Sequence, residues 1–167
     1  MSGTDVTREF EKAFAEWHGM KYALALSSGT AALQSAMWAC GVGVGDEIIV
    51  PSLTYWASAL PAFTLGATIV FAEVCADTLC LDPGDIEHRI TDRTKAIVPV
   101  HYTGMPCDMD PIVEVTERHG VKVIEDVSHA HGGLYKGRLV GTIGHVAAMS
   151  IMSGKALPSG EGGMLLT

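Results

Sequence analysis

The stretch YALALSSGTAALQSAMWAC at residues 22–40 decides the fold class of this chain. Residues 22–26 are apolar and uncharged, which is typical of a strand buried on both faces. A small polar loop follows at 27–30, and Leu33, Ala36 and Met37 then recur at helical spacing. The order strand, polar loop, helix is the building unit of α/β proteins.

The same alternation runs along the rest of the chain. Further strands are expected at 47–51, 67–74, 95–100, 121–125, 145–151 and 163–167. Helices are expected at 7–18, 54–65, 84–90 and 110–119. Because Val- and Ile-rich strands joined by helices form parallel sheets covered on both faces, we predict an α/β fold. Its three layers, α/β/α, surround a mostly parallel seven-stranded sheet.

Composition limits the function classes. The chain has 167 residues, 48% of them apolar, and no linker or repeat divides it, which predicts one folded domain over 1–167. Eleven basic and nineteen acidic residues give a formal charge of −8. A nucleic-acid surface or a polybasic membrane anchor needs an excess of Lys and Arg, so neither is expected. A small anion could still be held by local backbone dipoles.

The chain opens MSGTDVTREF, without the basic and apolar regions of a signal peptide. Its four cysteines form no C-x-x-C pair, and no zinc ribbon or disulfide framework is evident. A cytoplasmic protein is the resulting prediction. The last expected strand stops at Thr167 with no helix after it, so we expect the chain to be the first part of something longer.

One stretch, 51–72, lacks charged side chains and invites a comparison with a membrane span. It contains Pro61 and Gly66, and its flanks are acidic where a span usually has basic residues. A buried helix followed by a buried strand is the better interpretation.

Two glycine-containing segments differ in which element precedes them and which follows. The run 41–45 follows a helix and precedes a strand, the reverse of a dinucleotide-binding turn, which favours a helix stop. The segment SSGTAA at 27–32 follows a strand and precedes a helix, as a ligand-binding turn does. Its glycine permits close approach of a ligand, and a helix start attracts anions. It is a candidate phosphate cradle. A helix capped by Ser28 or Thr30 explains the same residues equally well.

Two acids end a predicted strand in VIEDVSHAHG at 123–132. Side chains alternate along a strand, so one of Glu125 and Asp126 should face the cleft and the other the opposite side. A carboxylate there could hold a protonated ring nitrogen. Equally, Asp126 could cap the next turn, and His131 could be a hydrogen-bonded core histidine. His129, His131, His145 and Asp126 lack metal-site spacing, so we expect no metal.

The stretch SIMSGKALPSGEGG at 150–163 sets a single lysine, Lys155, among small residues after a buried strand. Such an amine is a candidate for Schiff-base chemistry, although an ordinary loop lysine would look the same. An anion cradle, an acid at a strand end and a lysine in a small-residue loop are together the parts that pyridoxal phosphate (PLP) requires. These three features in this order are stronger evidence for a PLP site than any one of them alone.

With these motifs the chain resembles the DegT/DnrJ/EryC1/StrS aminotransferases, fold-type-I PLP enzymes that act on keto sugars. The resemblance covers nearly the whole chain and rests on five segments. They are SSGTAAL (27–33), GVGVGDEIIVPSLTYWAS (41–58), RTKAIVPVHYTGMPCDMD (93–110), VIEDVSHAHGGLYKGRLVG (123–141) and SIMSGKALPSGEGGMLLT (150–167).

The resemblance implies a role for each candidate residue. Lys155 would form the internal aldimine, and Asp126 would pair with the pyridine nitrogen. The phosphate would be held by Gly29, Thr30 and Ser150. Tyr55 would stack on the ring in preference to Trp56, and His129 stands where many members have Gln near the phenolic oxygen.

The resemblance further implies transfer of an amino group from glutamate or glutamine to a nucleotide-linked keto sugar or to a cyclitol. In this family a C-terminal small domain and a partner subunit complete each active site. The chain would therefore be the PLP-binding large domain of a homodimer or higher homo-oligomer. Two alternatives stay open: a non-catalytic PLP-binding or interaction module, and a PLP-dependent sugar dehydratase, which Lys155 disfavours because such enzymes carry His there. A chain without its second domain should also expose apolar surface and self-associate.

Overall fold

The computed structural model describes residues 3–167, so the first two residues of the predicted domain lie outside it. Its main sheet has seven strands in the order β1-β9-β8-β5-β4-β2-β3. They are β1 (Ala23–Leu26), β2 (Glu47–Pro51), β3 (Thr68–Ala72), β4 (Thr94–Ile97), β5 (Lys122–Asp126), β8 (Val146–Ser150) and β9 (Gly163–Leu166). All neighbouring pairs are parallel except those of β9, which runs antiparallel to both β1 and β8. The predicted sheet is confirmed.

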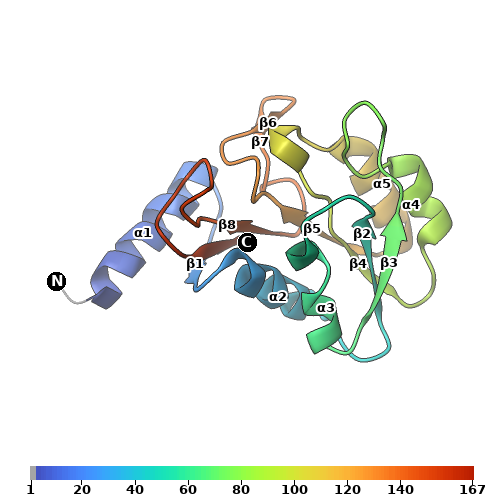
Figure 1. Ribbon diagram of the computed structural model, residues 1–167, viewed down its shortest axis with the longest axis horizontal. Helices are drawn as coiled ribbons and strands as arrows, with labels where there is room; N and C mark the ends of the chain where they lie inside the picture. The colour runs from blue at the N-terminus through green and yellow to red at the C-terminus, as the bar shows by residue number, and fades with distance from the viewer. Residues whose placement is uncertain (1–2) are drawn as a thin grey trace.

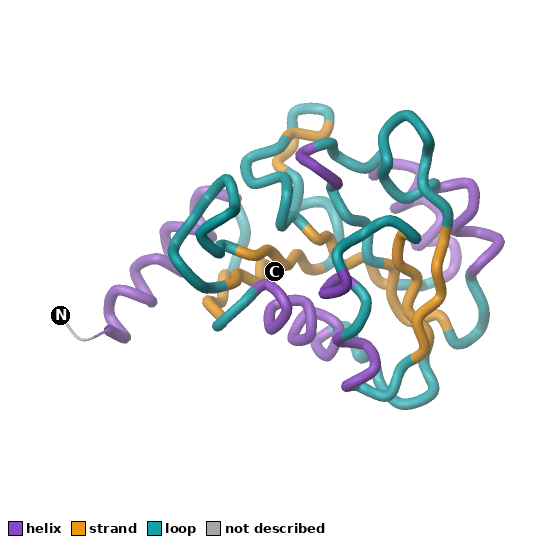
Figure 2. The backbone as a smooth tube through the Cα atoms, viewed as in Figure 1, coloured by secondary structure: helices purple, strands orange, loops and turns teal. Residues whose placement is uncertain are grey.

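Helices cover both faces of this sheet, which confirms the three layers (Figures 1 and 2). One face carries α2 (Gly29–Ala39) and α3 (Pro61–Thr64), and the other carries α1 (Gly3–His18), α4 (Pro83–Arg89) and α5 (Met109–His119). Alternation along β9 shows this division, because Leu165 packs with Leu33 of α2, whereas Met164 packs with Phe14 of α1.

Local sequence signals place the helix ends. Ser28 is the N-cap of α2, where its hydroxyl accepts a hydrogen bond from the Ala31 N–H at 3.1 Å. Helix α5 ends at Gly120, which adopts a left-handed conformation with φ 67°. The predicted helices 7–18, 84–90 and 110–119 are therefore present, with bounds shifted by a few residues.

The single helix expected at 54–65 is wrong. Two short helices lie there, a 3-10 turn η1 (Trp56–Ser58) and α3, which begins at Pro61. Proline has no N–H to donate and its ring clashes with the carbonyl four residues earlier, which favours the observed break at Pro61. The break turns residues 54–58 toward the ends of the central strands.

Two further expectations are wrong: that strand 22–26 is buried on both faces, and that strand 67–74 is buried. Strands β1 and β3 are the two edges of the sheet, and Leu24 and Phe71 are 50% and 55% exposed. Apolar composition does not reveal strand order, so it cannot separate an edge strand from a central one. A small hairpin, β6 (Leu134–Tyr135) with β7 (Arg138–Leu139), was not predicted.

Residues 51–72, the stretch compared with a membrane span, fold into the end of β2, η1, α3 and β3. Within residues 3–167 no helix combines the length and apolar character needed to cross a membrane.

Candidate active site

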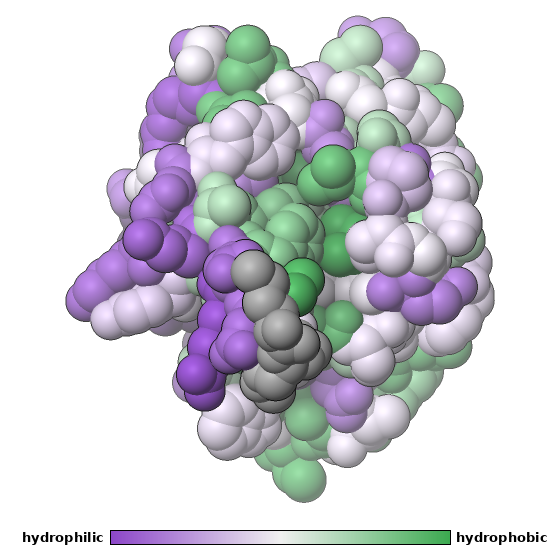
Figure 3. Space-filling model, turned by 90° about the vertical axis from the view of Figure 1, so that its left-hand side faces the viewer, coloured by the Kyte–Doolittle hydropathy of each residue, from purple (hydrophilic) through white to green (hydrophobic). Residues whose placement is uncertain are grey.

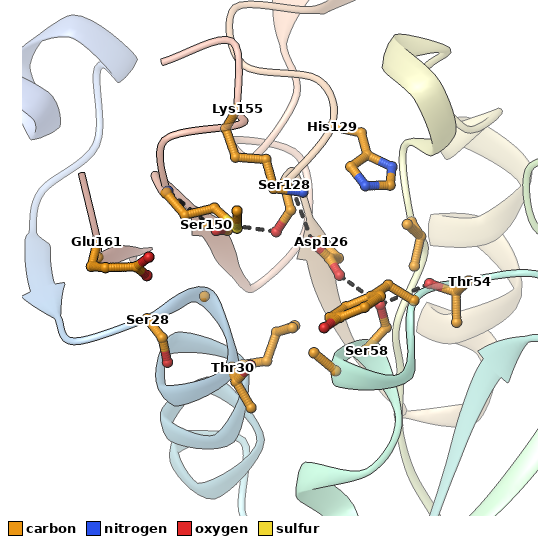
Figure 4. Close-up of a pocket in the computed structure, with 17 residues that line it drawn as sticks. Ser28, Thr30, Thr54, Ser58, Asp126, Ser128, His129, Ser150, Lys155 and Glu161 are labelled. Atoms are coloured by element: carbon orange, nitrogen blue, oxygen red, sulfur yellow. Dashed lines mark hydrogen bonds between the residues drawn. The ribbon is translucent and has the colours of Figure 1, made fainter. Parts of the chain in front are cut away.

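A cavity of about 410 Å³ lies where the carboxyl ends of β5 and β8 meet the start of α2 (Figure 4). In α/β sheets this edge is the usual place for a ligand. All seven predicted site residues line it: Gly29, Thr30, Tyr55, Asp126, His129, Ser150 and Lys155. They come from five separate segments of the chain, and the fold brings them together.

Asp126, the last residue of β5, presents its carboxylate to this cavity and is only 4% exposed. One oxygen, Oδ2, accepts a hydrogen bond from the Ser58 hydroxyl at 2.7 Å. The other, Oδ1, accepts from the Ser128 N–H at 3.0 Å, so Asp126 also caps the following turn. A carboxylate offers about four acceptor positions, which leaves this one able to accept a further N–H from a ligand.

Glu125 points to the opposite side of the same strand, as the alternation predicts. Its carboxylate is fully buried and accepts hydrogen bonds from His101 Nε2 at 3.0 Å and from three backbone N–H groups. Burial alone would raise the pKa of Glu125, but the hydrogen bond and charge of His101, with the N–H groups of Gly144 and Gly141, lower it overall. Glu125 is therefore a structural anion, separate from the cavity.

The start of α2 forms the anion-binding end of the cavity. A Cβ atom on Gly29 would lie 2.6 Å from the Ser150 Cβ, so only glycine lets the helix start pack against the end of β8. The N–H groups of a first helical turn have no partner within the helix and favour anions. The sequence left open a capped helix or a cradle, and the structure shows a cap at Ser28 within a helix start that still faces the cavity.

Lys155 reaches the cavity from the loop between β8 and β9 (Figure 4). Backbone hydrogen bonds fold this loop, among them Ser153 N–H to Gly160 carbonyl at 2.8 Å. Within residues 3–167 the Lys155 ammonium makes no hydrogen bond or ion pair. Burial first, and then the charge of Lys155, lower the pKa of His129, so the amine and the imidazole share one environment.

Tyr55 lines the cavity, whereas Trp56 lines a neighbouring groove with Phe63 and Phe71. This difference supports Tyr55 over Trp56 as the residue beside a bound ring. His129 also lines the cavity, with its Nδ1 3.5 Å from the Thr103 N–H.

His131 lies beside the site but does not line it. Its Nε2 is 2.8 Å from the Ser150 carbonyl oxygen, and its Nδ1 is buried without a partner in the described chain. The interpretation as a hydrogen-bonded interior histidine therefore fits. His145 instead accepts a hydrogen bond from the Val123 N–H, at the other end of β5. Among residues 3–167 no three His, Cys, Asp or Glu side chains come close enough to hold a metal ion.

Sequence reasoning missed Ser58 and Ser128, both of which bond to Asp126, and Glu161, which lines the cavity. The spacing D-x-S at 126–128 is a common turn pattern and could have revealed Ser128. Ser58 gave no such signal, because it lies 68 positions from Asp126 inside a segment expected to be one helix.

Comparisons with known proteins agree with this geometry. The model of the DegT/DnrJ/EryC1/StrS aminotransferase family matches residues 1–167. The chain belongs to this family. GDP-perosamine synthase of Caulobacter vibrioides is 50% identical over 159 residues, covering 95% of this chain and 43% of the relative. L-glutamine:2-deoxy-scyllo-inosose aminotransferase of Streptomyces fradiae is 45% identical over 99% of this chain and 39% of its own length.

Among solved structures, Spr1654 of Streptococcus pneumoniae in its PLP-form has a TM-score of 0.92 and 32% identity, over 96% of this chain and 45% of that one. The resemblance to the family and its fold is confirmed. This chain spans about two fifths of the length of the curated relatives named here.

PLP is the cofactor of the family, as predicted. The cavity fits it: a helix start for the phosphate, a buried carboxylate with free acceptor positions for the ring nitrogen, and an unpaired amine for the aldehyde. These three features surround one space whose volume is within the range of small-molecule sites, about 300–1,000 Å³.

Proposed function

We propose that this chain is the PLP-binding large domain of an aminotransferase that moves an amino group from glutamate or glutamine to a nucleotide-linked keto sugar. The observation that carries the proposal is that Lys155 and Asp126, from separate elements, line the same cavity as the α2 start. The C-terminal small domain expected from the sequence, which would complete the substrate pocket, belongs to the same proposal.

The predicted site residues have separate tasks in binding the cofactor. The first-turn N–H groups of α2, with Thr30 and Ser150, bind the phosphate. Asp126 accepts a hydrogen bond from the protonated ring nitrogen, and its negative charge keeps that proton in place. Tyr55 and His129 line the same cavity, where Tyr55 would contact the ring and His129 the phenolic oxygen.

When bound, PLP supplies an electron sink for the pair left behind when a proton leaves the carbon next to nitrogen. Lys155 provides the amine that holds the cofactor. Nζ of the same lysine, once free, would be the base that moves a proton away from the donor's α-carbon. Asp126 supports this transfer electrostatically, because its charge stabilises the positive ring nitrogen.

The choice of substrates rests on the relatives. One is named for GDP-perosamine, a nucleotide-linked amino sugar, and another names L-glutamine and an inosose. These names support a sugar or cyclitol acceptor and an amino-acid donor for this chain. The dehydratase alternative is disfavoured by Lys155.

A homodimer or higher homo-oligomer is also part of the proposal, supported by exposed apolar surface. Figure 3 views the end of the molecule at which α1 lies, and hydrophobic groups gather in the middle of this face. Exposed large apolar side chains on α1 and β1 include Val6, Trp17 and Leu24. The groove lined by Trp56, Phe63 and Phe71 is a second such region. Sedimentation should show self-association, and a compact monomer would contradict it. The cytoplasmic location stays a prediction.

The test is titration of the chain with PLP, followed by visible absorption. The parent should develop the band of lysine-bound cofactor, and Lys155→Ala should not. Lys12→Ala, on the exposed face of α1, is the matched control and should behave like the parent.

Addition of glutamate or glutamine should then convert the band to that of the aminated cofactor. A stable band with no conversion by either donor would favour the non-catalytic binding module. An unchanged band in Lys155→Ala would show that another amine holds the cofactor.

A further inference from the structure

The turn that carries Tyr55 is joined to Asp126 by a chain of side-chain hydrogen bonds. Ser58 donates to Asp126 Oδ2 at 2.7 Å, and Thr54 Oγ1 lies 2.8 Å from Ser58 Oγ. All three residues line the cavity, and Ser58 is 1% exposed (Figure 4). No role for Ser58 or Thr54 followed from the sequence.

The direction of each hydrogen bond follows from proton counting. An ionised carboxylate only accepts, so the single Ser58 proton must be donated to Asp126. Ser58 then has no proton left for its neighbour, and Thr54 must donate to Ser58. The chain therefore runs in one direction, from Thr54 through Ser58 to Asp126, and each donor strengthens the next.

The same link fixes the position of two parts of the site. Residues 54–58 are held as a turn by the Ser58 N–H bond to the Tyr55 carbonyl at 3.0 Å. Tyr55 is on this turn and Asp126 is at the end of β5, so the Ser58 hydroxyl fixes the distance between them. The hydrogen bond from the Ser128 N–H to Asp126 Oδ1 lies within the segment that follows β5. It does not connect Asp126 to the 54–58 turn.

We propose that Ser58 is a positioning residue, oriented by Thr54, that sets the Asp126 carboxylate and the Tyr55 turn around the cofactor ring. This inference rests on the proposed function. Ser58 touches neither substrate nor cofactor in this role. It acts by holding the acceptor for the ring nitrogen at one edge of the ring and the aromatic side chain over its face.

The first measurement needs no cofactor. The protein is labelled with aspartate carrying ¹³C at its carboxyl, and the Asp126 resonance is identified by its loss in Asp126→Asn. At constant pH, Ser58→Ala should move this resonance, because the carboxylate loses a donor. Ser52→Ala, an exposed serine beside the neighbouring groove, should leave it unchanged. An unmoved resonance in Ser58→Ala would overturn the inference.

The second measurement is PLP affinity and the pH dependence of the bound cofactor's absorption. Ser58→Ala should weaken PLP binding by about tenfold, the effect of one hydrogen bond to a charged group. It should also shift the pH profile of the band. Thr54→Val should change the PLP affinity and the pH profile in the same direction, but by less. Ser58→Thr returns the hydroxyl and should recover most of the parent's affinity and pH profile.

Parent-like affinity and pH profile in both Ser58→Ala and Thr54→Val would overturn the positioning role. If instead the parent shows the Ser58-dependent carbon shift but binds no PLP, the proposed function fails and the link from Ser58 to Asp126 stands.

Discussion

Glu125 and Asp126 are adjacent on β5, yet their carboxylates serve opposite faces of the sheet. Asp126 lines the cavity and accepts from Ser58, whereas Glu125 is enclosed on the other side by His101 and the backbone of 141–144. Asp126 is available to a ligand, whereas the carboxylate of Glu125 is occupied by hydrogen bonds within the fold. Substitutions at these two positions should therefore have different consequences.

Asp126→Asn should remove the charge with little change of shape. The cofactor should still attach to Lys155, but an amide cannot keep the ring nitrogen protonated. We expect the conversion of the bound cofactor by an amino donor to slow by about 10²–10³-fold, as for loss of a key electrostatic contact. Stopped-flow absorption measures the rate. Near-normal conversion would remove Asp126 from the pyridinium role.

Glu125→Gln should lower the free energy of unfolding. The amide cannot accept from all four donors, and it leaves buried N–H groups unpaired. Removing one partner of a buried pair costs about 3–5 kcal/mol, so a loss of this order in the free energy of unfolding is expected. Glu114→Gln, on the exposed side of α5, should change it by less than about 0.5 kcal/mol. Equal stability of the two variants in urea unfolding would contradict this assignment.

The lowered pKa of Glu125 also predicts a pH dependence. A carboxyl whose pKa is lower in the folded than in the unfolded chain stabilises the fold fully above its ordinary value of 4.5. That contribution is lost as the pH falls from there through the lowered pKa. Acid unfolding of the parent should therefore be steeper than that of Glu125→Gln, as followed by circular dichroism. Identical acid profiles would contradict the prediction.

Gly29→Ala tests the contact between the α2 start and Ser150. Helix propensity favours alanine, but its Cβ would lie 2.6 Å from the Ser150 Cβ and 2.8 Å from the Ser150 Cα. We expect a loss of about 1–3 kcal/mol, the usual cost of overpacking, together with weaker PLP binding. In Gly43→Ala the new Cβ has its nearest contact at 3.9 Å, so this variant is the control. Stability and PLP affinity like those of the parent in Gly29→Ala would show that the contact can relax.

Local features of the fold were predictable because they depend on local chemistry. Short, mostly apolar runs placed all seven strands, and Ser28 and Gly120 marked helix ends. Strand order depends on contacts between distant segments, which periodicity does not reveal. Consequently β1 and β3 were expected to be buried, although both are edges. The break at Pro61 was visible in the sequence but was outweighed by the apolar pattern around it.

The site, too, has residues that the sequence revealed and residues that only the structure revealed. Asp126 and Lys155 were identified because, together with the helix start at 27–32, they form the ordered set of groups that PLP requires, and because the motifs around them resemble the family. Ser58 was missed because a serine carries no signal of its own, and its importance comes from a partner on another element. Sequence alone indicated which groups carry chemistry, and the structure was needed to find what holds them.

Borohydride reduction of the PLP-loaded chain fixes the cofactor permanently to the amine that holds it. Proteolysis and mass spectrometry then identify the modified lysine. We predict a single modified peptide, with the phosphopyridoxyl group on Lys155, and no modification in Lys155→Ala. Reduction onto a different lysine in the parent, or none at all, would contradict the assignment of this cavity as the cofactor site.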